Sequence, residues 1–289
     1  MGLIETDETN KFTFEPFAAH QFYTDVNRNL VQQALAQLVA RAGATTFTIV
    51  DMACGTGAIT RLIAEEMVQR GYGDQTRLIG VDPSAEALRR AQKGMEEMGL
   101  NVQAEFIQGD AEDLVHIVKD ADAAFFCNAI HLVADKLAAM KQVAAILVSG
   151  GIFACNSAFY EGTYVPGTER FYRLWTRRAV GLLKKEHPEV QLSREAKAMA
   201  MQWLTPAGYI NHFKESGFGQ VHTHVTSVSM SLDAWRDLGQ YWLFIEGALP
   251  GVPLAYGAKA LGVAVYQAGQ ELNLEAVSRN WLQIVATKS

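Results

Sequence analysis

The sequence predicts an α/β fold, a three-layer sandwich in which helices cover both faces of a mostly parallel sheet. Two observations predict this fold. Between residues 47 and 157, short apolar runs of strand length alternate with stretches in which apolar residues recur at helical spacing. The first four strand-like runs each end in acidic or polar residues, as expected where the carboxyl ends of parallel strands form a ligand site.

The first strand and the loop after it carry the most informative motif, which reads IVDMACGTG over residues 49–57. Apolar residues alternate with threonine over residues 47–50, and residues 58–67 carry apolar residues at helical spacing. The turn Gly55-Thr56-Gly57 lies between them. Glycine adopts unusual backbone angles and lets a ligand approach the main chain, while the start of a helix offers unpaired N–H groups. This segment therefore predicts a cradle for a nucleotide cofactor.

The next strands supply acidic and polar residues at the same edge. The strand predicted over residues 77–82 ends in Asp82, whose carboxylate is suited to accept both hydroxyls of a ribose. Asp110 follows the strand predicted over residues 102–107 and could accept a hydrogen bond from the amine of an adenine. Strand 123–127 opens into Asn128. A helix over residues 135–147 and a fifth strand over residues 151–156 complete this part.

An NAD-binding fingerprint would share the acid after the second strand. It needs a third glycine where this loop has Thr60, which makes an NAD-dependent oxidoreductase a weaker alternative. Binding of a nicotinamide cofactor that a ligand with a sulfonium group does not displace would reveal such an oxidoreductase.

Four motifs, VDMACGTG, LIGVDPS, IQGDAEDL and CNAIHLV, stand in this order over residues 47–157. In order and spacing they resemble the class I S-adenosylmethionine-dependent methyltransferases of the small-molecule type, with a weaker likeness near the C-terminus. The resemblance implies a Rossmann-like, seven-stranded sheet with an antiparallel last strand, and an enzyme that takes its methyl group from S-adenosyl-L-methionine.

The resemblance also implies which residues hold this cofactor. Asp51 and the loop backbone hold the methionine part, and Asp82 binds the ribose. Asp110 and Ala111 flank the adenine, with Pro83 on its other face, and the backbone carbonyl of Asn128 holds the methionine amino group. Ala53 replaces the first glycine of the strictest family motif, which narrows the loop. The implied set is Asp51, Ala53, Cys54, Gly55, Gly57, Asp82, Pro83, Asp110, Ala111, Asn128 and Ala129.

Composition excludes several classes of partner. The formal net charge is −6 and the basic runs are short, which argues against a nucleic-acid partner because phosphate contacts need clustered lysine and arginine. Residues 1–15 lack an apolar stretch, so we expect no signal peptide and a cytoplasmic location. No segment reads as a membrane span. The three cysteines have no metal or redox spacing and read as buried and reduced, and no metal is predicted.

The chain is longer than this fold requires, and the additional segments predict where the acceptor binds. We expect an N-terminal helical lid over residues 1–46 and a core for the cofactor over residues 47–157. Two helical insertions then form a cap. The first covers residues 158–204, residues 205–230 form a core helix and the sixth strand, the second insertion covers residues 231–275, and residues 276–289 form the final strand.

Both insertions and the N-terminal segment are rich in aromatic residues, which commonly line ligand pockets. They favour a lipophilic or aromatic acceptor, while an amine held by cation–π contacts is an alternative. Each single ring has the alternative role of attaching the cap to the sheet. The predicted substrate-binding residues are Tyr160, Tyr164, Trp175, Trp242 and Glu246.

Methyl transfer asks the protein to align a nucleophile with the methyl–sulfur bond, to exclude water and, for an acidic acceptor, to take a proton. His131 is the first candidate base because it lies three residues beyond Asn128 at the sheet edge. Packing against the cofactor or capping a helix is the alternative for His131. Tyr23 and His20 come next as lid residues over the methionine part, with helix packing as their alternative role.

The predicted function is therefore methylation of a small, lipophilic or aromatic natural-product acceptor at oxygen, nitrogen or carbon. The alternatives are a primary-metabolism acceptor such as a quinone precursor, a fatty-acyl precursor or an amine, and a cofactor-binding chain with a scaffolding or non-methyl-transfer role. The N-terminal arm could cover its own site or, in a homodimer, that of a neighbour.

Overall fold

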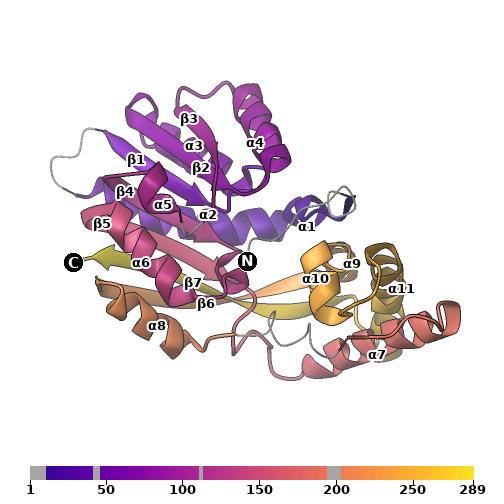
Figure 1. Ribbon diagram of the computed structural model, residues 1–289. Coiled ribbons are helices and arrows are strands. Elements are labelled where there is room, and N and C mark those ends of the chain that lie inside the picture. Colours follow the sequence, from indigo (N-terminus) through magenta and orange to yellow (C-terminus); the bar gives the residue numbers. More distant parts are fainter. Residues whose placement is uncertain (1–10, 42–45, 111–112, 194–202) are drawn as a thin grey trace.

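A seven-stranded sheet with the strand order β3-β2-β1-β4-β5-β7-β6 forms the centre of the molecule (Figure 1). The computed structural model describes residues 11–41, 46–110, 113–193 and 203–289. Strands β1 to β5 are parallel, and β7 runs antiparallel to both of its neighbours. The expected fold class is confirmed. The strands are β1 Phe47–Met52, β2 Thr76–Asp82, β3 Gln103–Gln108, β4 Ala121–Cys127, β5 Leu147–Ser157, β6 Phe218–Ser231 and β7 Ala276–Lys288.

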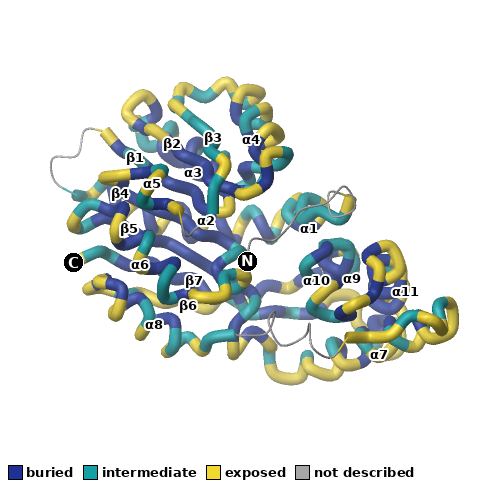
Figure 2. The backbone as a smooth tube through the Cα atoms, viewed as in Figure 1, coloured by how far each residue is buried: buried dark blue, intermediate teal, exposed yellow. Residues whose placement is uncertain are grey.

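Helices cover both faces of the sheet because the central strands are buried on both sides. Alternate side chains of a strand point to opposite faces. Ile49 accordingly packs into one apolar cluster and Val50 into the other, and both are fully buried. Figure 2 shows the inner strands in the dark blue of buried residues. Helices α2 Gln21–Val39, α3 Ala58–Gln69 and α4 Ala85–Met98 cover the first face, and α5 Leu114–Ile117, α6 Lys136–Ile146 and α8 Pro206–Glu215 cover the second.

Side-chain caps fix the starts of three of these helices. The hydroxyl of Ser84 accepts a hydrogen bond from the backbone of α4 at 3.1 Å. Asp135 and Thr205 do the same for α6 and α8, at 2.8 and 2.9 Å. Each cap satisfies an N–H group that the first turn of a helix leaves unpaired. Helix α4 begins at Ala85, directly after β2 ends at Asp82, and so starts beside the carboxyl edge of the sheet.

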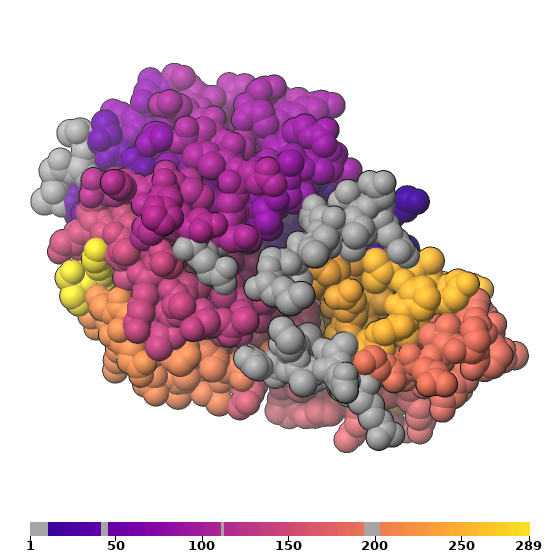
Figure 3. Space-filling model, in the orientation of Figure 1, coloured from indigo at the N-terminus to yellow at the C-terminus, as the bar shows by residue number. Residues whose placement is uncertain are grey.

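A group of helices stands beyond the carboxyl edge of the parallel strands and forms the cap (Figure 1). The last residue of β5, Ser157, pairs with Leu282, but β6 and β7 continue as a two-stranded ribbon until Ser231 pairs with Ala276. This ribbon carries the cap, whose orange and yellow surface lies to the right of the purple and magenta surface of the core in Figure 3. The cap helices are α1 Glu15–Ala18, α7 Glu169–Glu186, α9 Leu232–Leu238, α10 Trp242–Ala248 and α11 Leu254–Leu272.

The cap has an aromatic and aliphatic core of its own. Trp175 and Trp235 are buried and meet edge to face, with ring centroids 5.8 Å apart. Their indole nitrogens donate to backbone carbonyls of Leu261 and Val277, so neither buried N–H lacks a partner. Helix α11 packs against α7 and α9. Within the described ranges, no helix combines the length and apolar character that crossing a membrane requires.

Candidate active site

A cavity of about 1380 Å³ lies between the carboxyl edge of the sheet and the cap. Ligands of open parallel sheets bind at this edge. The two ends of this cavity are lined by different kinds of residue. The core end is lined by strand-end residues that include Met52, Cys54, Asp82, Asp110, Asn128 and His131, and the cap end by Phe159, Tyr164, Tyr172, Trp175, Trp242 and Phe244.

The loop between β1 and α3 bends through three residues with positive φ angles, Ala53 at 50°, Gly55 at 52° and Gly57 at 80°. A Cβ atom at Gly57 would lie 3.1 Å from the Cβ of Ala91, so glycine there lets α3 approach α4. At Gly55 nothing lies within 4 Å of that position. Gly55 therefore leaves its backbone open to a ligand, whereas Ala53 holds a conformation that is costly for a residue with a side chain.

Asp82 holds this loop against the end of β2. One carboxylate oxygen of Asp82 accepts a hydrogen bond from the backbone N–H of Gly55 at 2.8 Å. The other accepts from the backbone N–H of Ser84 at 2.9 Å. Asp82 lines the cavity. Its carboxylate is therefore fixed in orientation at the cavity wall.

Asp51 lies behind the loop and does not line the cavity. The hydroxyl of Thr60, the residue in place of a third glycine, donates to its carboxylate at 2.5 Å. Burial raises the pKa of Asp51 to about 7; the Thr60 hydrogen bond opposes this shift and the charge of Asp82 adds to it. Asp51 thus supports the loop from within the protein.

Asn128 has a positive φ of 57° and its side chain is fully engaged. Its amide nitrogen donates to Asn27 and to the hydroxyl of Tyr23, both at 3.0 Å, and its oxygen accepts from the indole of Trp281 at 3.0 Å. Its backbone N–H donates to the side chain of Asn156 at 2.9 Å. A ligand at Asn128 would therefore meet its backbone rather than its amide group.

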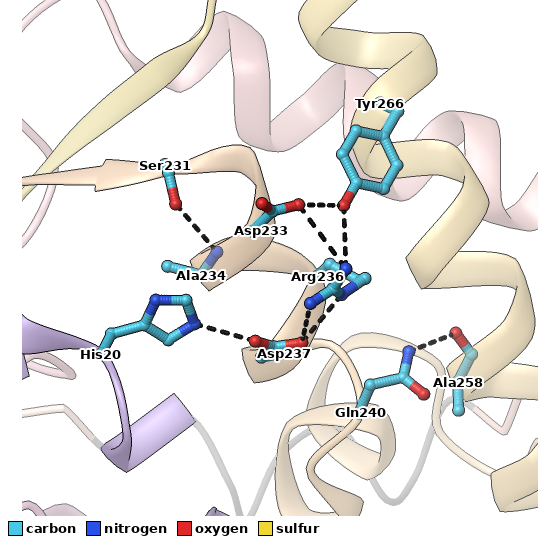
Figure 4. A network of polar contacts seen from close by, with 9 residues as sticks. All are labelled: His20, Ser231, Asp233, Ala234, Arg236, Asp237, Gln240, Ala258 and Tyr266. Carbon is cyan, nitrogen blue, oxygen red and sulfur yellow. Dashed lines mark hydrogen bonds and ion pairs between the residues drawn. The ribbon is translucent and has the colours of Figure 1, made fainter. Parts of the chain in front are cut away.

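Tyr23 and His20, although both come from the N-terminal segment, lie in different surroundings. Tyr23 lines the cavity, and burial raises its pKa well above the usual range, so its hydroxyl stays protonated. His20 does not line the cavity. Its Nε2 lies 2.8 Å from the carboxylate of Asp237 on α9, which also binds Arg236 (Figure 4). His20 therefore joins the start of α2 to the cap.

His131 lies on the short 3-10 helix Ile130–Leu132 and lines the cavity. Its Nδ1 is 3.0 Å from the hydroxyl of Ser157, and its ring stacks on Phe159 with centroids 4.5 Å apart. Burial, followed by the positive charges of Lys136 and Arg279, lowers its pKa to about 3. The imidazole is therefore neutral at neutral pH.

Comparisons with known proteins agree with a cofactor site at this edge of the sheet. The sequence model of a family described as "Methyltransferase domain" covers residues 49–151. The yeast (Saccharomyces cerevisiae) protein named "Probable S-adenosylmethionine-dependent methyltransferase CRG1" is 32% identical over 117 residues, 38% of this chain and only 35% of that protein. The "Ubiquinone/menaquinone biosynthesis C-methyltransferase UbiE" of Rhodopseudomonas palustris is 26% identical over 189 residues, 63% of this chain and 69% of that protein. These matches identify residues 49–151 as a methyltransferase domain of the class I S-adenosylmethionine-dependent type.

The expected family, enzyme class and cofactor are thereby confirmed. Among solved structures, the cyclopropane synthase MmaA2 from Mycobacterium tuberculosis superposes with a TM-score of 0.56 at 13% identity, over 98% of this chain and 94% of that one. At this identity the likeness concerns the fold. It extends through the cap as well as the core of this methyltransferase.

The core end of the cavity fits S-adenosylmethionine, on the evidence of the open backbone at Gly55 and the oriented carboxylate of Asp82. The structure brings most of the residues predicted for the cofactor to the cavity wall. Asp51 and Gly57 stand behind it, and Ala111 lies outside the described residues. The predicted residues that line the wall are Ala53, Cys54, Gly55, Asp82, Pro83, Asp110, Asn128 and Ala129.

At the cap end, the structure separates the predicted substrate-binding residues of this methyltransferase. Tyr164, Trp175, Trp242 and Glu246 line the cavity, and burial raises the pKa of Glu246. Tyr160 does not. Tyr160 follows β5 and is buried in the apolar cluster on the second face of the sheet. Its side chain therefore points away from the cavity.

Three further cavity residues adjoin His131 or Asn128, and none of them is among the residues predicted individually from the sequence. Phe159 stacks on His131, Trp281 donates to Asn128, and Arg279 brings a positive charge into the wall. Arg279 and Trp281 both lie on the β6–β7 ribbon. The available signal was an arginine in a final strand whose other charged residue, Lys288, stands at its end.

Proposed function

We propose that this methyltransferase transfers the methyl group of S-adenosylmethionine to a small, lipophilic or aromatic natural-product acceptor, at oxygen, nitrogen or carbon. The observation that carries the proposal is the continuity of the cavity. The motif residues of the core line one end and the rings of the cap line the other, so a donor and an acceptor can share one cavity.

The proposed division of labour follows the predicted boundaries. Residues 47–157 hold the donor, and the N-terminal helix with the two insertions holds the acceptor. S-adenosylmethionine, when bound, supplies an electrophilic methyl group. Asp82 accepts hydrogen bonds from the ribose hydroxyls, Asp110 from the adenine amine, and the loop backbone around Gly55 holds the methionine part.

His131 is the proposed proton acceptor. Ser157 lies 3.2 Å from the carbonyl of Phe159 and donates its single hydroxyl proton there. Nδ1 of His131 then donates to Ser157, which leaves the lone pair on Nε2 for the acceptor. Tyr23 stays a neutral phenol and orients the end of β4 through Asn128. Alignment and exclusion of water supply the rest of the rate.

Methylation of a quinone precursor at carbon is the second candidate. The sequence likeness to a ubiquinone/menaquinone biosynthesis C-methyltransferase favours it, and flat rings suit the aromatic cap end. The two candidates share the donor site and differ only in the acceptor.

Calorimetric titration of the protein with S-adenosylmethionine, S-adenosylhomocysteine and NAD tests the donor site. We expect micromolar or tighter binding of the sulfur ligands and none of NAD. Mass spectrometry of reactions with phenols, indoles, amines and quinone precursors then finds the acceptor class. Absence of binding by either sulfur ligand would contradict the proposal and indicate a scaffolding role.

A further inference from the structure

Arg279 is a buried cation in the wall of the cavity. It lies on the β6–β7 ribbon and is only 3% exposed. Its Nε donates to the backbone carbonyl of Ala158 at 2.6 Å, which fixes the plane of the guanidinium. The side chain of Arg279 also forms a hydrogen bond with the phenol of Tyr172, and the guanidinium lines the cavity. Arginine keeps its charge at every pH at which the protein is folded.

The surroundings of Arg279 supply rings but no acid. The guanidinium carbon lies 4.6 Å from the ring centre of Phe159, 5.6 Å from those of Tyr164 and Tyr172, and 5.7 Å from that of Trp235. Cation–π contacts of this kind offset part of the cost of burial. Within the described part of the chain, no carboxylate lies within 4.0 Å of it to form an ion pair.

The charges that act on His131 are positive. Lys136 and Arg279 both act on His131, and the rings of Tyr164 and Tyr172 lie beside Arg279. A buried charge without an opposite charge is costly, so a ligand anion at this place gains from the charge of Arg279.

We propose that Arg279 binds a carboxylate of the methyl acceptor, so that the substrates of this methyltransferase are carboxylic acids with a lipophilic or aromatic body. This inference rests on the proposed function. A monoanion matches the single guanidinium of Arg279 among its surrounding rings, whereas a phosphate dianion would bring an excess charge. The planar edge of arginine matches a planar carboxylate.

The position of Arg279 places the acid close to the chemistry. Phe159 contacts both His131, at 4.5 Å, and Arg279, at 4.6 Å between the guanidinium carbon and the ring centre. An acceptor held by its carboxylate at Arg279 therefore reaches the space beside His131. Its negative charge offsets the repulsion that Arg279 exerts on an imidazolium, which makes His131 a better proton acceptor only when the substrate is in place.

The test uses a matched pair of probes, 2-naphthoate and 2-naphthamide, titrated calorimetrically into the protein saturated with S-adenosylhomocysteine at pH 7.5. We expect the acid to bind at least about tenfold more tightly than the amide. Equal affinities, with S-adenosylhomocysteine bound, would overturn the role of Arg279 and leave the proposed function intact. Failure of S-adenosylhomocysteine to bind would instead overturn the proposed function, and this inference with it.

Variants then assign the preference to a residue. Arg279→Met should reduce the acid-to-amide preference to below about twofold, while Arg279→Lys keeps the charge and part of the preference. Arg177→Met is the matched control, because Arg177 also lines the cavity but is exposed on α7. A preference that survives in Arg279→Met, or that Arg177→Met removes equally, contradicts the proposal. Should Arg279→Met not fold, Arg279→Lys and the wild-type comparison decide.

Discussion

The side-chain oxygen of Asn27 lies 3.0 Å from the amide nitrogen of Asn128, and this hydrogen bond joins helix α2 to the carboxyl end of β4. The same oxygen accepts a second hydrogen bond, at 2.8 Å, from Asn156 at the end of β5. Asn27 is fully buried, and its own amide donates to the backbone carbonyl of Tyr23. Helix α2 is therefore held against the two strand ends that border the cavity.

Replacement of Asn27 by leucine should destabilise the protein. The change leaves one amide N–H of the partly buried Asn128 and one of the buried Asn156 without an acceptor, at a cost of about 2 to 4 kcal/mol in the free energy of unfolding. Chemical denaturation measures it. Asn29→Leu is the control, because Asn29 is exposed on the same helix and its loss should cost well under about 1 kcal/mol. Equal effects of the two changes would contradict a special role for the Asn27 network.

Asp82→Ala should weaken binding of S-adenosylhomocysteine by about 1 to 3 kcal/mol, because ribose hydroxyls and the N–H of Gly55 lose their acceptor. Isothermal calorimetry gives the change directly. The isosteric Asp82→Asn should keep part of the affinity, since one oxygen remains as an acceptor. An unchanged dissociation constant in Asp82→Ala would place the ribose elsewhere.

His131→Ala should lower turnover by about 10²-fold while the affinity for the donor changes little, if His131 takes a proton in the reaction. His131→Gln keeps a hydrogen-bonding side chain but no basic nitrogen, and should be impaired to a similar extent. His116→Ala serves as the control because His116 is an exposed residue of α5. Full turnover in both His131 variants would show that alignment alone carries the transfer.

Asp51 and His131 should impose opposite pH dependences on stability. The pKa of Asp51 rises from 3.8 to about 7 on folding, so its contribution is present below pH 4 and is lost as the pH rises through about 7. The pKa of His131 falls from 6.5 to about 3, so its contribution is present above pH 6.5 and is lost as the pH falls towards 3.

Single variants separate these two contributions. Between pH 4 and 7, Asp51→Asn should gain stability relative to wild type as the pH rises, and His131→Gln should gain as it falls, each by on the order of 1 to 4 kcal/mol. Urea denaturation at several pH values measures both slopes. Parallel curves for wild type and Asp51→Asn would mean that Asp51 is already ionised at pH 4.

Ala53→Gly should raise the stability slightly. Glycine adopts the left-handed conformation of residue 53 without the steric cost that alanine has there, which adds about 1 to 2 kcal/mol to the free energy of unfolding. The greater freedom of glycine in the unfolded chain cancels about half of this increase. The expected net gain is about 0.5 to 1 kcal/mol by chemical denaturation. A loss of stability comparable to that of a core substitution would argue that the methyl group of Ala53 has a packing role.

The features predictable from the sequence were those encoded within a few neighbouring residues. The turn at Gly55 and the acid at Asp82 each stand next to their own strand, and the parallel sheet brings such strand ends to one edge. Tyr160 and Tyr164 show the limit. Both are tyrosines after β5, yet only Tyr164 faces the cavity, because the path of the backbone there depends on contacts with β7.

Arg279 could not be assigned a role from the sequence for a related reason. Its role depends on Ala158 and Phe159, more than a hundred residues earlier, and on the extension of β7 past β5. His20 likewise meets Asp237 across the cap, a contact between distant segments. Local patterns show what a residue is able to do, while such long-range packing decides what it faces.

The β6–β7 ribbon makes the second insertion an exchangeable module. Ser231 and Ala276 pair directly, so the segment between them leaves and re-enters the sheet at neighbouring points, where a short hairpin turn would also close it. Changes in the length or sequence of this segment alter the cap end of the cavity without shifting the register of any core strand. Arg279 stays with the strand rather than the module. Diversification of the cap would thus vary the body of the acceptor while its charged end stays the same.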